Sequence, residues 1–324
     1  MTSDGARSNW GRWGGEDERG ALNLVTPEVV LGAAKALRNG KVYSLGLPIS
    51  ATRTPKVFDR PAPDRLTRNS PHDDRRVGAA EETGHIGSAE DLLVMATHSG
   101  THLDALAHIH EDGLYYNGHS FETFTTARGA GKCSIVRTGS AATRGVLLDV
   151  ASLVAGRGSG EVAVAGARDA VTQRSGSGFR SVPLPQGHTI TPVELDACCA
   201  TQGVDVRPGD AVLVRTGWVE LFEADRATPG YPQAGIGLEA AAWLQDHDVA
   251  LVGADNSAVE VLPFDQGKFL GVHAALIVHS GVGLLEHLWL AGLAADGCHE
   301  FLLVIGALPI VGATGSPINP IAIG

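Results

Sequence analysis

The stretch THSGTHLDALAHIHEDGLYYNGH, residues 97–119, holds five of the chain's 13 histidines together with three acidic residues. The apolar, partly β-branched run EDLLVMAT that leads into it predicts a strand. In a strand alternate side chains share one face, which places His98, His102 and Asp104 together, and Gly100 leaves room for an ion. In a helix, His98 and His102 would still meet four residues apart. Either geometry gives two imidazoles and a carboxylate, a ligand set that suits zinc, manganese or iron.

The other histidines of this stretch receive different interpretations. His108 follows the ligand group and is predicted to act as a base, whereas His110 and His119 fit no further phase and are interpreted as structural. A histidine pair with this spacing can also be an ordinary surface or core pair, so metal binding stays a hypothesis at this point. Zinc-finger spacing is absent, and Ser99 and Gly100 stand where a metalloprotease helix would need a glutamate.

Composition limits the class of protein. The chain has 324 residues, of which 44% are hydrophobic and 19% charged, which is typical of a folded globular protein with one large domain or two ordinary ones. The net charge of -11 argues against nucleic acid as a partner. Residues 1–20 lack the apolar core of a secretory signal, and the apolar run from Phe301 is too short to span a bilayer. We therefore expect a cytoplasmic protein without a membrane partner. The cysteines show no metal-ligand spacing and are interpreted as packed thiols: Cys133, Cys198, Cys199 and Cys298.

Helical and extended patterns alternate along the chain, and this predicts a mixed α/β or α+β fold. Capping residues such as Thr26 and Thr191 precede two of the helical patterns. Helices are expected over 26–40, 190–203 and 237–248, and strands over 41–49, 210–218, 249–255 and 301–310. Two polar regions interrupt the pattern: residues 51–91, interpreted as a lid-like loop, and residues 155–187, interpreted as a Gly/Ser-rich loop with partial disorder.

The segment HSGTHLDALAH, residues 98–108, resembles the His-x-Gly-Thr-His-x-Asp-x-x-x-His signature of the cyclase family. This family comprises metal-dependent hydrolases related to kynurenine formamidase and isatin hydrolase. The resemblance extends over most of the chain and indicates the subgroup with longer chains. It implies a cyclase-like swivelling β/β/α fold in a single domain over 1–324, with residues 1–25 as an N-terminal arm. Further similar stretches are RWGGEDERGALNLVTPEVV (12–30), TRGVLLDVA (143–151), PGDAVLVRTGW (208–218), VGADNSAVEVLPF (252–264) and GATGSPINPIAI (312–323).

The resemblance also implies further metal ligands. The segment VHAALIVHSGVGLLEHL, residues 272–288, is similar to a second family element and maps His273 and Glu286 onto its metal-binding pair. The residues alone leave this assignment open, because His279 and His287 lie nearby; the resemblance makes these two structural. The implied site holds one or two zinc or manganese ions, with Asp104 as the bridge between two. Its ligands are His98, His102, Asp104, His273 and Glu286.

In the family, metal-bound water attacks the carbonyl of an amide or lactone, and the last histidine of the signature, here His108, handles the proton. The implied activity is hydrolysis of a cyclic amide, a lactone or an N-formyl amide. Two alternatives remain: dehydrating ring closure of the polyketide type, and a non-catalytic binding protein on the same fold. Leu106 departs from the family pattern, since shorter members often have proline there, and this leaves the substrate open.

The expected partners are a small-molecule substrate and further copies of the chain. The resemblance suggests a homo-oligomer, a dimer or tetramer, in which the N-terminal arm lies near a neighbour's pocket. Aromatic and amide side chains elsewhere are weaker candidates for the substrate wall: Trp10, Trp13, Asn23, Phe58, Asn256 and Ser257.

Overall fold

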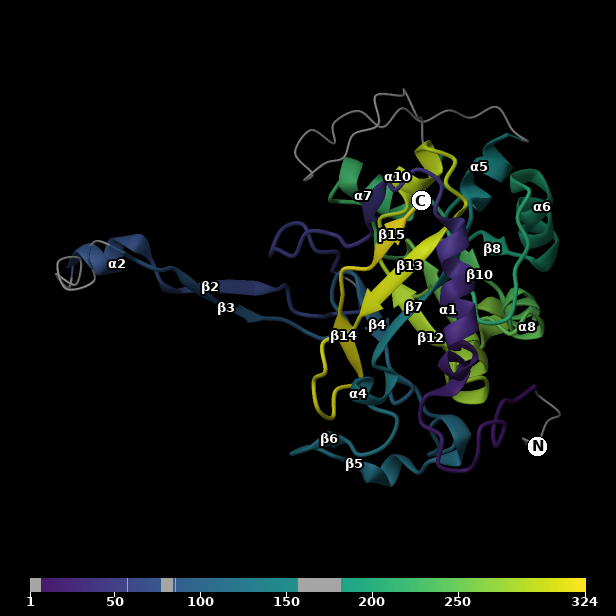
Figure 1. The fold of residues 1–324 in the computed structure, drawn as a ribbon, viewed down its shortest axis with the longest axis horizontal. Coiled ribbons are helices and arrows are strands. Elements are labelled where there is room, and N and C mark those ends of the chain that lie inside the picture. The colour runs from purple at the N-terminus through teal and green to yellow at the C-terminus, as the bar shows by residue number, and fades with distance from the viewer. Residues whose placement is uncertain (1–6, 57, 77–83, 85, 157–181) are drawn as a thin grey trace.

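The computed structural model describes residues 7–56, 58–76, 84, 86–156 and 182–324. Most of the Gly/Ser-rich loop predicted over 155–187 therefore lies outside the described residues. Strands from both ends of the chain meet in one nine-stranded sheet with helices packed against it (Figure 1). The mixed α/β class expected from the sequence is confirmed.

The sheet is parallel in its centre and antiparallel towards both edges. Strands β7, β9, β11 and β12 run parallel, whereas the strands on either side of this group pair antiparallel. In sheet order the strands are β1 (Val42–Ser44), β15 (Ile321–Ile323), β13 (Glu300–Gly306), β7 (Ser140–Leu148), β9 (Ala211–Val214), β11 (Leu251–Ala254), β12 (Gly283–Glu286), β4 (His102–Asp104) and β14 (Gly315–Pro317).

The central strands are buried on both faces. Their side chains alternate between two hydrophobic clusters: Val212 and Val252 belong to the cluster on one face, and Leu213 and Leu251 to the cluster on the other. Parallel strands covered on both sides are typically continuous apolar runs, and this explains why the sequence signals of β9 and β11 are strong.

Three predicted helices are confirmed as α1, α6 and α8. Thr26 caps α1, and Thr191 with Glu194 forms a capping box at α6. Helices α5, α6 and α8 pack on one of the two clusters. Among the described residues, no helix has both the length and the apolar character needed to cross a membrane. The helices are α1 (Pro27–Ala33), α2 (Pro71–Arg76), α4 (Ile135–Thr138), α5 (Val150–Ala155), α6 (Pro192–Gln202), α7 (Trp218–Ala224), α8 (Leu238–Asp246), α9 (Gly271–His273), the π-helix η6 (Ala274–His279) and α10 (Ala291–Ala295).

Short elements complete the fold. They are the 3-10 turns η1 (Gly20–Leu24), η2 (Ala34–Ala36), η3 (Tyr116–Gly118), η4 (Phe121–Thr123) and η5 (Asp265–Gly267), and the strand pairs β5 (Phe124–Thr125) with β6 (Gly129–Ala130) and β8 (Thr189–Ile190) with β10 (Gly235–Ile236).

The region interpreted as a lid-like loop over 51–91 is instead largely a projecting arm, which corrects the prediction. Strands β2 (Asp64–Asn69) and β3 (Glu90–Val94) pair antiparallel, and α2 lies beyond β2. Figure 1 shows this arm extending away from the body rather than over it. Strand β3 falls within the run EDLLVMAT that was predicted as a strand, whereas β2 was missed because charged residues break its alternation of apolar and polar residues.

The N-terminal segment packs on its own chain. The backbone N–H of Asn9 donates to the carbonyl of His279 at 2.9 Å, and the indole N–H of Trp10 donates to the carbonyl of Val278 at 2.7 Å. Trp13 is half-buried against the same hydrophobic cluster. These contacts join residues 9–13 to the end of η6, close to the segment that carries His273.

Candidate metal centre

The signature residues His102 and Asp104 lie on β4, between β12 and β14. His102 and Asp104 lie two positions apart and therefore share a face of the sheet. Glu286 of β12 is directly opposite His102 in the register, and Gly315 of β14 is opposite Asp104. The run EDLLVMAT, predicted as a strand, forms β3 (Glu90–Val94), but this strand does not continue to Asp104: His98 lies in a turn, and β4 begins only at His102.

This turn fixes the orientation of His102. Gly100 adopts a left-handed backbone with φ of 64°, which glycine reaches without steric cost. Its carbonyl accepts hydrogen bonds from Nδ1 of His102 at 2.8 Å and from Nδ1 of His287 at 3.2 Å. A carbonyl only accepts, so both rings carry their proton on Nδ1. The Nε2 lone pair of His102 is therefore directed away from the turn.

Four side chains converge around that lone pair. His102 Nε2 is 3.5 Å from Asp104 Oδ1 and 3.2 Å from Glu286 Oε2. His273 Nε2 is 3.5 Å from Glu286 Oε1 and 3.9 Å from Asp104 Oδ2. Ligands at about 2.0–2.1 Å from one tetrahedral ion are roughly 3.4 Å apart. Asp104, His273 and Glu286 offer donor atoms that all lie within 4.8 Å of one another, and His102 faces both carboxylates, so the spacing suits a bound cation.

Two buried atoms in this group have no hydrogen-bond partner. They are Nε2 of His102 and Oδ2 of Asp104, in side chains that are 0% and 1% exposed. An unpaired polar atom in the interior is costly unless something satisfies it. Both are lone-pair donors, so a hydrogen-bond acceptor would not satisfy them and a cation would. The donor set fits a metal ion.

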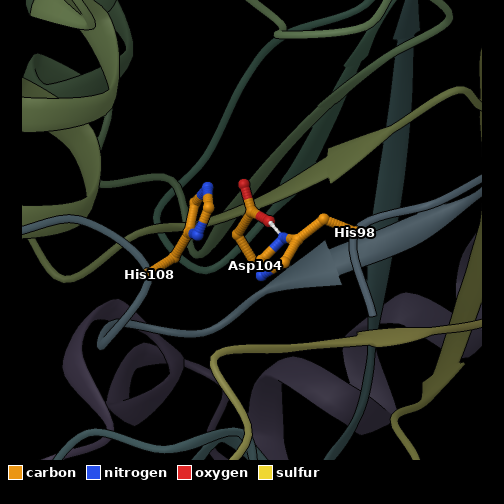
Figure 2. Close-up of side chains that lie close together, drawn as sticks. All are labelled: His98, Asp104 and His108. Carbon is orange, nitrogen blue, oxygen red and sulfur yellow. Dashed lines mark hydrogen bonds and ion pairs between the residues drawn. The ribbon is translucent and has the colours of Figure 1, made fainter. Parts of the chain in front are cut away.

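A second group adjoins the first and shares Asp104 with it. His98 Nδ1 lies 2.6 Å from Asp104 Oδ1, and the rings of His98 and His108 stack with centroids 3.9 Å apart. Figure 2 shows these three side chains together. His98 Nε2 contacts Thr314 Oγ1 at 2.9 Å, so both its ring nitrogens have protein partners. A Cβ at Gly315 would lie 2.5 Å from the His98 ring, so only glycine leaves room for it there.

Among the described residues, three groups have a spacing that suits an ion. One comes from the signature alone, and two combine the signature with the second family element around His273 and Glu286. They are His98, Asp104 and His108; Asp104, His273 and Glu286; and His102, Glu286 and His287. The structure thus brings together all six side chains singled out as ligands or base, from β4, the turns around it, α9 and β12. It adds His287, whose left-handed backbone, with φ of 53°, follows directly on the end of β12.

Buried carboxylates dominate the electrostatics of the centre. Burial disfavours the charged form of His273, but hydrogen bonds to Glu260 and Glu286 outweigh it and raise the pKa of His273 to about 10. Burial opposes ionisation of Glu286 as well, and the charge of Asp104 adds to this, yet His102 and His273 lower its pKa to about 2. The pocket therefore favours bound positive charge, and a metal ion would displace protons from it.

His108 differs from the ligands. Burial lowers its pKa to about 4, although the charge of Asp104 opposes this shift. Its imidazole is consequently neutral at pH 7 and able to accept a proton. Its ring centroid lies 6.2 Å from that of His273, so it faces both groups.

The weaker candidates for the substrate wall have separate surroundings. Asn23 donates to Asp17 and to the carbonyl of Gly20, and so holds the turn at η1. Phe58 is 53% exposed and lies near the arm. Asn256 and Ser257 are fully buried beneath the centre, where Ser257 Oγ is 2.9 Å from His287 Nε2. Trp10 and Trp13 pack beside η6, as described above. His110 stacks on Phe121 at the surface and His119 contacts the carbonyl of Asp17, as their structural interpretation expects.

Sequence reasoning missed Glu260. This residue is 1% exposed and its Oε1 lies 2.5 Å from Nδ1 of His273. It stands in the block VGADNSAVEVLPF, whose similarity to the family was noted without a role for the glutamate. An acidic residue within an otherwise apolar run was the available signal.

Comparisons with known proteins identify the family and the fold. The model of the family described as "Putative cyclase" matches residues 43–261. A solved structure described as a novel cyclase is 32% identical, with 98% of this chain and 100% of that chain covered and a TM-score of 0.82. No curated protein matches the chain.

Two more distant structures share the fold. An isatin hydrolase bound to the product analogue thioisatinate is 18% identical, with 94% of this chain and 97% of that chain covered and a TM-score of 0.58. A predicted metal-dependent hydrolase from Bacillus stearothermophilus is 20% identical, with 88% and 99% covered and a TM-score of 0.51.

Proposed function

The chain belongs to the cyclase family, and on that premise we propose that it is a metal-dependent hydrolase that opens a cyclic amide, a lactone or an N-formyl amide. The observation that carries the proposal is the pair of unpartnered buried donors, Nε2 of His102 and Oδ2 of Asp104, within a set of four converging ligands. The structures of similar fold that are described as isatin hydrolase and as metal-dependent hydrolase support this class of reaction.

His102, Asp104, His273 and Glu286 would hold one divalent ion. A second ion, if present, would lie between His98 and Asp104, and Asp104 would then contribute to both. A divalent cation in such a site lowers the pKa of a water molecule towards neutrality and polarises a carbonyl oxygen.

The chain's own side chains position and move the proton. The neutral ring of His108, next to Asp104, accepts a proton from the attacking water and returns it to the leaving nitrogen or oxygen. Asp104 lies beside the rings of both His98 and His273. Its negative charge therefore stabilises an imidazole that becomes protonated next to it. Burial of the centre strengthens these interactions, since water does not screen them.

Three finer points belong to the same proposal. The ion is zinc or manganese, because imidazole and carboxylate ligands suit both. The chain forms a homo-oligomer, and the exposed leucines of the arm supply the contact surface. The expected cytoplasmic location can be tested by fractionation of the source cells.

The function is tested by metal analysis and substrate hydrolysis. The purified protein is expected to contain zinc or manganese by mass spectrometry, to lose ring opening of isatin, N-formylkynurenine or a lactone after chelation, and to regain it with one of the two ions. His102→Ala should bind no metal, whereas His110→Ala, a matched change outside the centre, should behave as wild type. Full turnover after complete removal of metal, or a wild-type protein that binds no metal, would contradict the proposal.

A further inference from the structure

Glu260 lies outside the donor set but makes two hydrogen bonds with His273 and a third with the neighbouring Val272. Its Oε1 lies 2.5 Å from Nδ1 of His273, and its carboxylate accepts the backbone N–H groups of His273 and Val272, both at 3.3 Å. We propose that Glu260 is a positioning residue that fixes the tautomer and orientation of His273 for metal binding. This inference rests on the proposed function, because it assigns a role at the same site.

The direction of the hydrogen bond determines which nitrogen is free. A carboxylate accepts, so in the neutral ring, the form that binds a metal, Nδ1 of His273 carries the proton and Nε2 keeps its lone pair. That lone pair faces Glu286 Oε1 at 3.5 Å and Asp104 Oδ2 at 3.9 Å. Glu260 therefore selects the one tautomer in which His273 can contribute to the donor set, and its negative charge makes the ring a stronger ligand.

The backbone around Glu260 is held tightly. Val259 has a φ of 60°, which is strained for a β-branched residue. Asn256 Nδ2 donates to the carbonyls of Ala234 at 2.7 Å, Glu260 at 3.3 Å and Val259 at 3.4 Å, and so surrounds the strained residue with hydrogen bonds. Strain of this kind persists where neighbouring contacts enforce it, often at functional sites.

The same short segment orients a second histidine. Ser257 Oγ contacts His287 Nε2 at 2.9 Å and accepts from Gln233 Nε2 at 2.7 Å. His287 in turn donates to the carbonyl of Gly100, which also fixes His102. Residues 256–260 thus contact the histidine rings on both sides of the donor set, which an isolated core ion pair would not require.

The inference is tested by metal affinity rather than turnover. Glu260→Ala and Glu260→Gln are compared with wild type by competition with a chelating zinc indicator and by the visible absorption spectrum of the cobalt(II)-loaded protein. The alanine variant is expected to bind zinc about 10- to 100-fold more weakly, the usual effect of losing a partner of a metal-bound histidine. Glutamine keeps an acceptor oxygen and should lose less.

The control is Glu223→Ala. Glu223 lies on α7, its side chain is 6% exposed, and it pairs with Arg53 and Arg226. It should leave zinc affinity and the cobalt spectrum unchanged even if it lowers the melting temperature. If Glu260→Ala does not fold, Glu260→Gln carries the test, with a weaker affinity and a shifted spectrum expected. Wild-type affinity and an unchanged spectrum in the folded variant would overturn the role of Glu260 alone. A wild-type protein without metal affinity would overturn it together with the proposed function.

Discussion

The metal centre and the projecting arm differ in how far contacts within one chain bury their side chains. At the centre, His102, Asp104 and Glu286 are at most 3% exposed, and partners from several elements hold each side chain. On the arm, Leu66 and Leu92 are 47% and 53% exposed, and the two strands pair only with each other. An isolated two-stranded ribbon is marginally stable in water. One chain therefore suffices to build the centre, whereas we propose that a surface from outside the chain covers the arm.

The two regions are nonetheless joined. Only three residues separate strand β3 of the arm from His98, and Arg60 at the root of the arm donates to the carbonyl of His98. If the comparison is correct, substitutions at the centre should act within one chain, and substitutions on the arm should act between chains.

The largest effect is expected from His108→Ala. Removing the proton acceptor should lower turnover by about 100- to 10,000-fold, the usual size of general acid–base assistance. Metal content and melting temperature should stay nearly intact, because His102, Asp104, His273 and Glu286 still converge. Steady-state kinetics and metal analysis check both. His110→Ala is the matched control, since His110 lies at the surface against Phe121. A His108→Ala protein that binds metal and keeps more than about a tenth of wild-type turnover would show that His108 is not the base.

Asp104→Asn should have the next largest effect. The substitution keeps the shape of the side chain but removes the charge that faces His98 and His273 and offsets a cation. Loss of a residue that hydrogen-bonds to a metal ligand costs about 10- to 100-fold in metal affinity, and loss of a ligand itself should cost at least as much. Competition with a chelating indicator measures it. Asp196→Asn on α6, away from the centre, serves as the control. Unchanged metal affinity would remove Asp104 from the ligand set.

The sequence predicted the parts of the fold that local patterns determine. Helices α1 and α6 have side-chain caps, and strands β9 and β11 are continuous apolar runs, so each was recognisable alone. In the arm, β3 was recognisable as the run EDLLVMAT, whereas β2 was not, because charged residues that pair across the ribbon, as Arg65 does with Asp91, break its alternation. The order of the strands in the sheet depends on tertiary packing, so no single segment of the sequence predicts it.

The candidate site divides in the same way. His98, His102, Asp104 and His108 lie within eleven residues, so their proximity follows from the chain itself. The pairing of Glu286 with His102 comes from the register of β12 and β4, and for it the family resemblance was needed. Glu260 reaches His273 through a left-handed valine and a network of hydrogen bonds, which no spacing rule indicates.

The smallest effect is expected from the arm, and it should appear only in association. Leu66 and Leu92 are opposite each other in the register and share one face of the ribbon, whereas Leu93 points the other way, into a groove of about 590 Å³ that Leu47 and Trp289 also line. The charges of the arm pair with one another across the strands, which leaves these leucines as its free apolar surface.

A second copy of the chain is the proposed occupant of that face, since a two-fold axis would place the same leucines of both arms together. About half of Leu92 remains to be buried, so Leu92→Ser should weaken association by about 10- to 30-fold and leave zinc affinity unchanged. Val193→Ser on α6 removes an apolar side chain that is 72% exposed and lies on a separate element, and it should not alter association. Sedimentation and light scattering across a concentration series measure both variants. A wild-type chain that stays monomeric at micromolar concentration, or a Leu92→Ser chain that associates as tightly as wild type, would mean that another surface completes the arm.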